Sequence, residues 1–258
     1  MTGLRGRLRE LQVAVMLLTR LPAGRIEGEA PALSAARWAF VPVGALVGLL
    51  GWAALAGTLA TGASPPLAAV LAVAAHVLAT GALHVDGLAD FADGLGGGRD
   101  RTHCLEIMRD SRIGSYGVMA LILASALWVA ALAQLGPQLG SWGGAGWFVL
   151  IGMFSRAAMV AVQEGLPPAR ADGMGRLAAG RSRAARLVLL VVTAGGLLLA
   201  GATGLMLVLV CATVAAALGR LAQQRIGGVT GDVLGAVQLV SEVFCWTALA
   251  LLSAPWAL

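Results

Sequence analysis

One apolar run of this chain, residues 187–219, reads LVLLVVTAGGLLLAGATGLMLVLVCATVAAALG and contains no charged residue. A membrane span needs about 20 apolar residues, and a helix rises about 1.5 Å per residue, so this run is too long for one ordinary span and tight for two. Its middle holds four glycines, Gly195, Gly196, Gly201 and Gly204. We therefore predict a hairpin of two short helices, with one long tilted helix as the alternative.

The composition of the whole chain is that of a membrane protein. Hydrophobic residues make up 59% and charged residues 12%, and the mean hydropathy is +0.85, far from the usage of soluble domains. The apolar runs are continuous and lack period-two alternation, which argues against a β-barrel. The net charge of +5 does not indicate a nucleic-acid partner, because this composition leaves no soluble body to carry a basic stripe. The three cysteines have no CxxC spacing, so neither a disulfide framework nor a zinc site is indicated.

We predict an all-α fold, a polytopic bundle in one integral membrane domain, residues 1–258. It has about seven spans and an N-terminal interfacial helix over the Arg-rich and then apolar residues 4–21, which are too short to span and are followed by Pro22. The expected spans are 38–60, 65–85, 114–135, 146–163, 187–200, 203–218 and 232–253.

The arginines predict the orientation of the spans. Six lie in residues 1–37, four in 86–112, five in 163–186 and two in 219–231, whereas the alternate connections at 61–66, 136–145 and 201–204 carry no charge. Arg-bearing loops stay in the cytosol. We expect a cell inner-membrane protein with a cytosolic N-terminal segment (1–37), a cytosolic catalytic segment (84–113), a second cytosolic turn (227–232) and an outside C-terminus. The basic loop with Arg170, Arg176, Arg181, Arg183, Arg186 and Asp172 is explained mostly by topology.

Nearly half of the acidic residues fall in the cytosolic segment that follows the second span. If residues 84–94 continue that span as a helix, Asp86, Asp90 and Asp93 share one face. Like charges at this spacing repel, so a cation is expected among them, and carboxylates beside a phosphate suit Mg²⁺. The alternative is a solvated, acidic helix end. His84 points away from this face, and we do not expect it to be a metal ligand.

A run of glycines is expected to end this helix and to let the backbone approach a ligand, although a flexible linker is an equal reading. It consists of Gly94, Gly96, Gly97 and Gly98. A second acidic pair, Glu106 and Asp110, is interleaved with Arg109 and Arg112, as a site for a diphosphate and its metal requires. Taken singly, these four residues are ordinary surface ion pairs.

The second cytosolic turn, GGVTGD at 227–232, opens the last span. Its backbone N–H groups and the helix N-terminus suit an anion, so Thr230 and Asp232 are candidate substrate contacts; an ordinary N-cap is the equal alternative for Asp232. Arg156 and Glu242 lie inside predicted spans, where an ionisable group needs a partner or a wet cavity. We expect them to pair with each other or to line a polar pocket.

Three motifs resemble the adenosylcobinamide-GDP ribazoletransferase family, also called cobalamin synthase. They are HVDGLADFADGLGGGRDR at 84–101, LEIMRDSRIGSYG at 105–117 and GGVTGDVLGA at 227–236, supported by TRLP at 19–22, Pro42, Gly44 and Ser155-Arg156. Some members carry an acid near position 239, where this chain has Gln238 and Leu239. The resemblance implies a polytopic, Mg²⁺-dependent inner-membrane enzyme that joins α-ribazole or its 5′-phosphate to adenosylcobinamide-GDP and releases GMP.

With this reaction in view, we expect Asp86, Asp90 and Asp93 to hold Mg²⁺ and Arg109 and Arg112 to stabilise charge on the diphosphate. Asp110 or Glu106 is the expected base for the ribazole hydroxyl; the alternative is that the metal lowers the pKa of that hydroxyl. Further substrate contacts are expected from Gly96, Gly97, Arg99, Ser111, Arg156, Thr230 and Asp232. One alternative is a CDP-alcohol-type phosphotransferase, but the second half of its sequence motif is missing here. The other is a cation transporter, and the clustering of the acids at one end of the spans argues against it.

Overall fold

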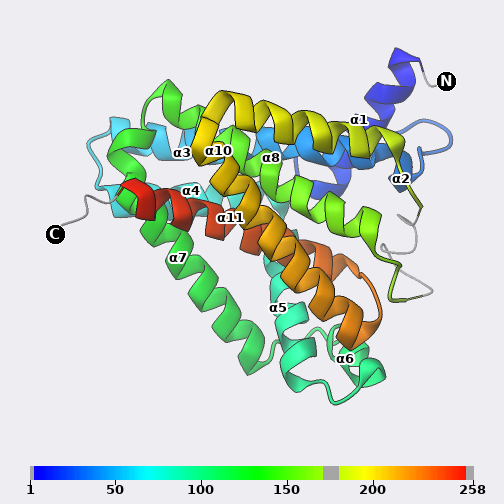
Figure 1. Ribbon diagram of the computed structural model, residues 1–258. Helices are drawn as coiled ribbons and strands as arrows, with labels where there is room; N and C mark the ends of the chain where they lie inside the picture. The colour runs from blue at the N-terminus through cyan, green and yellow to red at the C-terminus, as the bar shows by residue number, and fades with distance from the viewer. Residues whose placement is uncertain (1–2, 171–179, 254–258) are drawn as a thin grey trace.

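The computed structural model describes residues 3–170 and 180–253, and within these ranges it contains helices and no strand. Figure 1 shows a bundle in which α3, α4, α8 and the first half of α10 run roughly along one direction, while α5 runs across that direction and lies below them with α6. The helices are α1 (Leu4–Leu18), α2 (Leu33–Ala36), α3 (Phe40–Ala60), α4 (Pro65–Thr80), α5 (Leu83–Gly97), α6 (Arg101–Ile107), α7 (Ser115–Leu139), α8 (Trp142–Gly165), α10 (Arg183–Ile226) and α11 (Gly231–Ser253), with a short 3-10 turn at Arg37–Ala39.

The all-α membrane class predicted from the sequence is confirmed. In the described part of the chain, five helices are long and apolar enough to cross a membrane, or six if α4 and α5 form one broken span. The number seven stays a prediction. The central helices approach closely through glycines: a Cβ atom on Gly44 of α3 would stand 2.1 Å from the carbonyl oxygen of Gly152 in α8. Small residues at helix contacts are typical of packing in lipid.

The predicted hairpin in 187–219 is present, and Gly201 is its turn. The backbone there is non-helical, with φ 53° and ψ −129°. A Cβ atom on Gly204 would stand 2.3 Å from the carbonyl oxygen of Gly196, a residue that an unbroken helix would hold about 12 Å away. In Figure 1 the yellow half of α10 accordingly reverses into the orange half. Glycine is suited to such a backbone because it has no Cβ.

The second expected span, 65–85, is wrong at its C-terminal end, and residues 84–94 do not continue it as a straight helix. The helix stops at Thr80, and α5 starts at Leu83 with a bend of 89° between them. Gly81 and Ala82 both have left-handed φ angles, 60° and 61°. Arg20 packs against Gly81, where a Cβ atom would stand 2.2 Å from its Nε, and the Arg20 backbone N–H donates to the carbonyl of Ala79 at 2.7 Å. Helix α5 therefore does not continue α4 as a straight helix.

The expected loop at 136–145 is almost entirely helical. Helix α7 continues through Pro137 to Leu139, and α8 begins at Trp142. The indole N–H of Trp52 lies within hydrogen-bond distance of the carbonyl oxygens of Leu139 and Ser141, at 3.1 and 3.2 Å. Leu139 is the last residue of α7, so its carbonyl is one of those that the end of a helix leaves unpaired.

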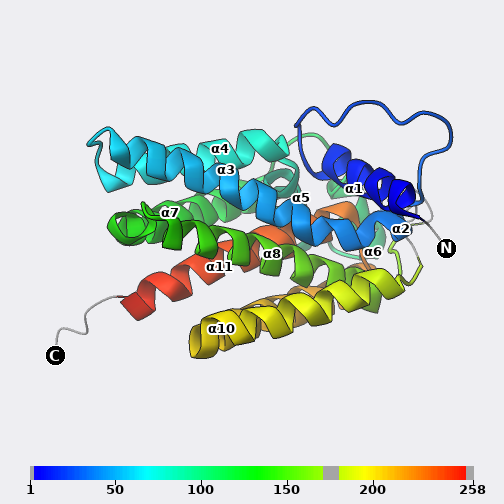
Figure 2. The same ribbon diagram turned by 90° about the horizontal axis from the view of Figure 1, so that it is seen from above.

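The N-terminal segment forms the helix that was expected for an interfacial position. Val13, Ala14 and Leu18 of α1 are buried, whereas Leu4 and Leu8 are exposed. Figure 2 shows α1 beside the α2 end of α3, away from the far ends of the other helices. Its position at the membrane surface stays a prediction.

Candidate active site

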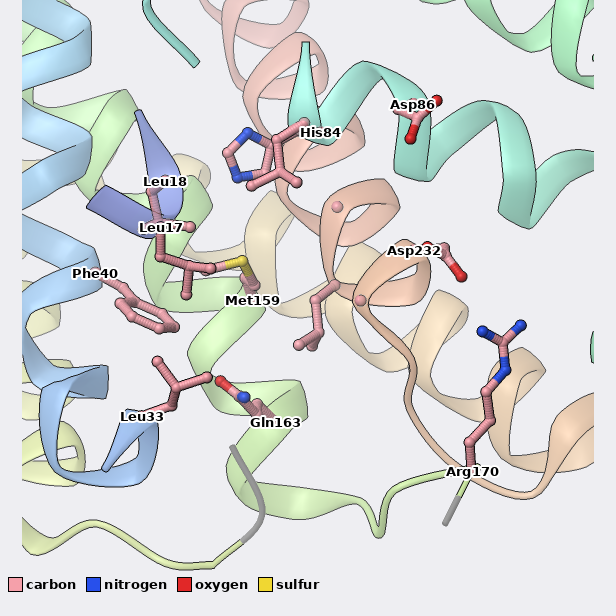
Figure 3. Close-up of a pocket in the computed structure, with 14 residues that line it drawn as sticks. Leu17, Leu18, Leu33, Phe40, His84, Asp86, Met159, Gln163, Arg170 and Asp232 are labelled. Atoms are coloured by element: carbon pink, nitrogen blue, oxygen red, sulfur yellow. The ribbon is translucent and has the colours of Figure 1, made fainter. Parts of the chain in front are cut away.

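Helices α5 and α11 cross at two glycines, and the crossing creates the candidate active site. A Cβ atom on Gly87 would stand 3.0 Å from the carbonyl oxygen of Asp232, and one on Gly235 would stand 3.3 Å from the Cα of Gly87. Residues with larger side chains would hold the two backbones apart. The crossing brings Asp86, the neighbour of Gly87, to the same cavity as Asp232, although the two are far apart in the sequence (Figure 3).

The cavity beside this crossing has a volume of about 210 Å³ and two unlike ends. Figure 3 shows Asp86, Asp232 and Arg170 together on one side. The other side is apolar and is lined from α1, α2, α3 and α8 by Leu17, Leu18, Leu33, Phe40 and Met159. A mostly apolar cavity with a few convergent polar groups is the usual form of a small-molecule site.

Asp90 lies one turn further along α5, among the other acids. Burial and the nearby carboxylates of Asp86, Asp232 and Asp93 raise the pKa of its carboxyl group to about 7, against the opposing effect of Arg170. The positive charge of Arg170 therefore does not fully neutralise the negative charge of these carboxylates. A cation at this place would relieve the repulsion.

The acids suit a divalent metal in charge and in ligand type, but they do not form a complete metal cage. In residues 3–170 and 180–253, no three His, Cys, Asp or Glu side chains are arranged to hold a metal ion by themselves. Mg²⁺ is commonly bound by one or two carboxylates together with substrate phosphate oxygens. The polar end of the cavity fits a site of that shared kind.

Asp93 has a structural contact that the sequence analysis did not foresee. Its Oδ2 accepts the backbone N–H of Gly114 at 2.7 Å, and its Oδ1 accepts that of Gly117 at 2.8 Å. A carboxylate at this position caps the N-terminus of α7 and joins α7 to α5. Its role as a metal ligand stays a prediction, which this contact weakens.

The expected catalytic group around α6 lies on the surface and does not line the cavity. Asp110 pairs with Arg112 at 2.6 Å, and this partner lowers the pKa of Asp110 to about 2. Glu106 and Arg109 are exposed. Arg99 and Ser111, expected to contact substrate, are exposed as well and do not line the cavity either.

Helix α5 ends inside the glycine run, as expected: Gly97 is its last residue and Gly98 is its C-cap. Members of the run also let neighbouring segments pack against the helix. A Cβ atom on Gly96 would stand 2.4 Å from the Tyr116 ring, and one on Gly97 would stand 3.2 Å from the side chain of Ile107. The structure therefore shows packing where the sequence analysis expected a close approach of a ligand to the backbone.

Two residues of the turn at 227–232, Gly231 and Asp232, line the cavity, whereas Thr230 does not. Thr230, and not Asp232, is the N-cap, because its hydroxyl accepts the backbone N–H of Val233 at 3.3 Å. The same hydroxyl donates to the carboxylate of Asp232 at 3.1 Å. Asp232 is thereby oriented at the edge of the cavity (Figure 3).

Arg156 and Glu242 pair with each other, as the sequence analysis expected, at 2.8 Å. The side chain of Arg156 has no exposed surface and does not line the cavity, so its expected contact with substrate is not seen. Gln238 and Ser155 also hydrogen-bond the Glu242 carboxylate, and His76 lies 3.4 Å from it. This group is a buried polar network inside the bundle.

Three cavity residues were not identified as site residues from the sequence. Arg170 was attributed mostly to topology, His84 was set aside as lying off the metal face, and Gln163 was not considered. Gln163 could have been identified as a site residue because its polar side chain lies at the end of an apolar span. His84 could have been identified because it is the first residue of the first family motif. Arg176 and Asp172 of the basic loop lie outside the described residues.

Comparison with known proteins places these motifs in one family. Residues 10–250 match the family described as cobalamin-5-phosphate synthase. Relatives named adenosylcobinamide-GDP ribazoletransferase include those of Xanthobacter autotrophicus (45% identity over 248 residues, 91% of this chain and 92% of the relative), Sinorhizobium medicae (42% over 262 residues, 97% and 99%) and Bradyrhizobium diazoefficiens (40% over 250 residues, 93% and 92%). No solved structure matches the chain.

Proposed function

This chain belongs to the cobalamin-5-phosphate synthase family, and we propose that it joins α-ribazole or α-ribazole 5′-phosphate to adenosylcobinamide-GDP with release of GMP. It is an enzyme of cobalamin synthesis that transfers ribazole. The family match favours this activity over a CDP-alcohol phosphotransferase and over a cation transporter. The observation that carries the finer proposal is the meeting of Asp86, Asp232 and Arg170 at the mouth of a largely apolar cavity.

The reaction requires the diphosphate to be held while a ribose hydroxyl of the acceptor attacks the phosphorus atom on the cobinamide side. A new P–O ester bond forms there, the bond from that phosphorus to the bridging oxygen breaks, and GMP departs with the bridging oxygen. Arg170 is positioned for the diphosphate, since it lines the polar end of the cavity. Its Nη2 donates to the carbonyl of Leu105 at 2.9 Å, which anchors the side chain. A guanidinium is well suited to bind phosphate oxygens through two hydrogen bonds.

The acids of α5 supply the metal site in this proposal. Asp86 and Asp90 would hold Mg²⁺ together with oxygens of the substrate diphosphate. When bound, the metal neutralises charge on the diphosphate and stabilises the departing GMP. The raised pKa of Asp90 supports this assignment, because it reports an uncompensated negative charge.

We assign Asp232 as the general base that accepts the proton of the acceptor hydroxyl. The expected bases, Asp110 and Glu106, do not line the cavity, and the pKa of Asp110 is lowered to about 2 by Arg112. Asp232 does line it, and the Thr230 hydroxyl orients its carboxylate. A general base has to lie within hydrogen-bond reach of the proton that it accepts.

We further propose that the site faces the cytosol of the cell inner membrane. The bend at Gly81 and Ala82 turns α5 away from α4, and Arg225 donates to the carbonyl oxygens of Leu95 and Gly98 at the end of α5. Positive loops of a multi-pass protein remain on the cytosolic side. The lipid bilayer then surrounds the apolar helices, and both substrates arrive from the cytosol.

The purified protein in detergent, supplied with adenosylcobinamide-GDP and α-ribazole, tests the function. GMP should appear only when both substrates and Mg²⁺ are present, and EDTA should abolish it. Asp232→Asn should release GMP far more slowly, whereas Glu29→Gln, which removes an exposed acid outside the cavity, should match the wild type. GMP release that does not depend on Mg²⁺, or release of CMP from a CDP-alcohol with no GMP release from adenosylcobinamide-GDP, would overturn the proposal.

A further inference from the structure

Two polar side chains are buried at the cavity without partners for their polar atoms. His84 is 3% exposed, and in the described part of the chain neither of its ring nitrogens has a hydrogen-bond partner. Gln163 is 8% exposed, and its Oε1 has no partner among the same residues. Native proteins keep few such atoms, because burying an unpaired polar group costs stability. Both residues line the same cavity, which suggests a ligand that forms hydrogen bonds with their unpaired polar atoms.

The walls around these groups restrict what the ligand can be. Figure 3 shows the His84 ring pointing from α5 toward Leu17 and Leu18, with Met159 and Phe40 beyond. The volume of about 210 Å³ is below the roughly 300–1,000 Å³ of pockets for drug-sized ligands. A single flat ring system fits these walls, and a corrinoid macrocycle does not.

The bend before α5 is what directs His84 into the cavity. His84 is the second residue of α5, just after the left-handed Gly81 and Ala82. On its other side, the Cα of His84 lies 3.3 Å from where a Cβ atom on Gly235 would stand. The same crossing therefore positions both His84 and the acids.

We infer that the apolar part of this cavity binds the aromatic base of the acceptor nucleoside, with a ring N–H of His84 donating to the free ring nitrogen of that base. The inference rests on the proposed function and names the subsite for one of its substrates. The base of ribazole is a flat bicyclic ring with two methyl groups and one nitrogen acceptor, which matches apolar walls and a single donor. The ribose then extends toward Asp86 and Asp232, whereas Gln163 lies beside Leu33 at the apolar end (Figure 3).

His84→Phe tests the hydrogen bond, since it keeps a flat ring and removes both nitrogens. The KM for α-ribazole should rise on the order of tenfold, while the KM for adenosylcobinamide-GDP and the kcat at saturating α-ribazole stay unchanged. Trp128→Phe is the matched control: it removes another buried N–H that lacks a partner among the described residues, but Trp128 does not line the cavity. This control should leave both KM values at the wild-type level.

Two measurements keep the inference testable if His84→Phe misfolds or if turnover fails. With the wild-type protein, the riboside of unsubstituted benzimidazole should bind on the order of tenfold more weakly than α-ribazole, because two methyl groups lose their apolar contacts. Equilibrium dialysis of each riboside against the protein without adenosylcobinamide-GDP gives this comparison independently of GMP release. Equal affinity of the two ribosides would overturn the inference, as would a His84→Phe variant with unchanged KM for α-ribazole. Absence of GMP release by the wild type would overturn the proposed function alone.

Discussion

Gly87 of α5 and Gly235 of α11 face each other so closely that a methyl group on Gly235 would stand 3.3 Å from the Cα of Gly87. The contact at Gly87 is tighter still, with the Asp232 carbonyl oxygen 3.0 Å from the position of a Cβ atom. The separation of the two helices at this point controls where Asp86 and Asp232 meet. The geometry of the site is therefore sensitive to a single methyl group placed there.

Gly87→Ala should separate α5 from α11 and lower turnover on the order of a hundredfold, because small misplacements of reacting groups are costly. The overall fold should be kept, which circular dichroism and gel filtration can check. Gly57→Ala is the control, since a Cβ atom on this α3 glycine would have no neighbour within 4 Å. Full activity of Gly87→Ala would show that the crossing does not position the acids.

Asp90→Asn should lower turnover on the order of a hundredfold or more, because the metal and the diphosphate lose one carboxylate. The metal-free protein should be equally stable or more stable, since like-charge repulsion is relieved. Stabilisation by added Mg²⁺, measured as a shift in Tm, should be smaller than in the wild type. If Asp90→Asn kept full activity at limiting Mg²⁺, Asp90 would not be a metal ligand, and the ligands would have to be sought at Glu106, Asp110 or Asp232.

The stability of the metal-free protein should depend on pH through Asp90. Its pKa is raised from 3.8 to about 7, so between these values the folded chain keeps a proton that the unfolded chain has lost. Stability should therefore fall as the pH rises through this window. Melting curves in EDTA should show this fall in the wild type and a weaker one in Asp90→Asn. Parallel pH profiles of the two proteins would contradict the assignment.

Arg156→Leu should act on stability and not on substrate binding. The variant leaves the buried carboxylate of Glu242 without its charged partner, at a cost of about 3–5 kcal/mol. Replacing both residues, Arg156→Leu with Glu242→Leu, should recover much of that loss. Tm and the KM values of the folded fraction measure the two effects separately. A raised KM at an unchanged Tm would instead indicate that Arg156 contacts the substrate.

Cysteine labelling checks the predicted orientation. A cysteine introduced as Ser141→Cys should react with an impermeant reagent in intact spheroplasts, and one introduced as Ser111→Cys only after the membrane is opened. Both positions are exposed, and the natural cysteines Cys104, Cys211 and Cys245 are buried. Reaction at Ser111→Cys alone in intact cells would reverse the topology.

The sequence by itself was sufficient for the features that depend on composition and on local chain geometry. Continuous apolar runs predicted the all-α membrane class, because a backbone in lipid has to satisfy its own hydrogen bonds. The glycines of 187–219 predicted the reversal that the structure places at Gly201. The spacing of Asp86 and Asp90 predicted a shared helix face, since the helical period alone determines it.

Only the tertiary structure decided which partner each of these faces meets. The bend before α5 depends on Arg20 packing against Gly81, and the capping of α7 by Asp93 depends on Gly114 and Gly117. Likewise, Asp232 reaches the acids of α5 only because Gly87 and Gly235 let two distant helices touch. The helical period of a segment determines which side of the helix is polar. Which residues contact that side depends on the packing of segments that are distant in the sequence, so it cannot be read from any single segment.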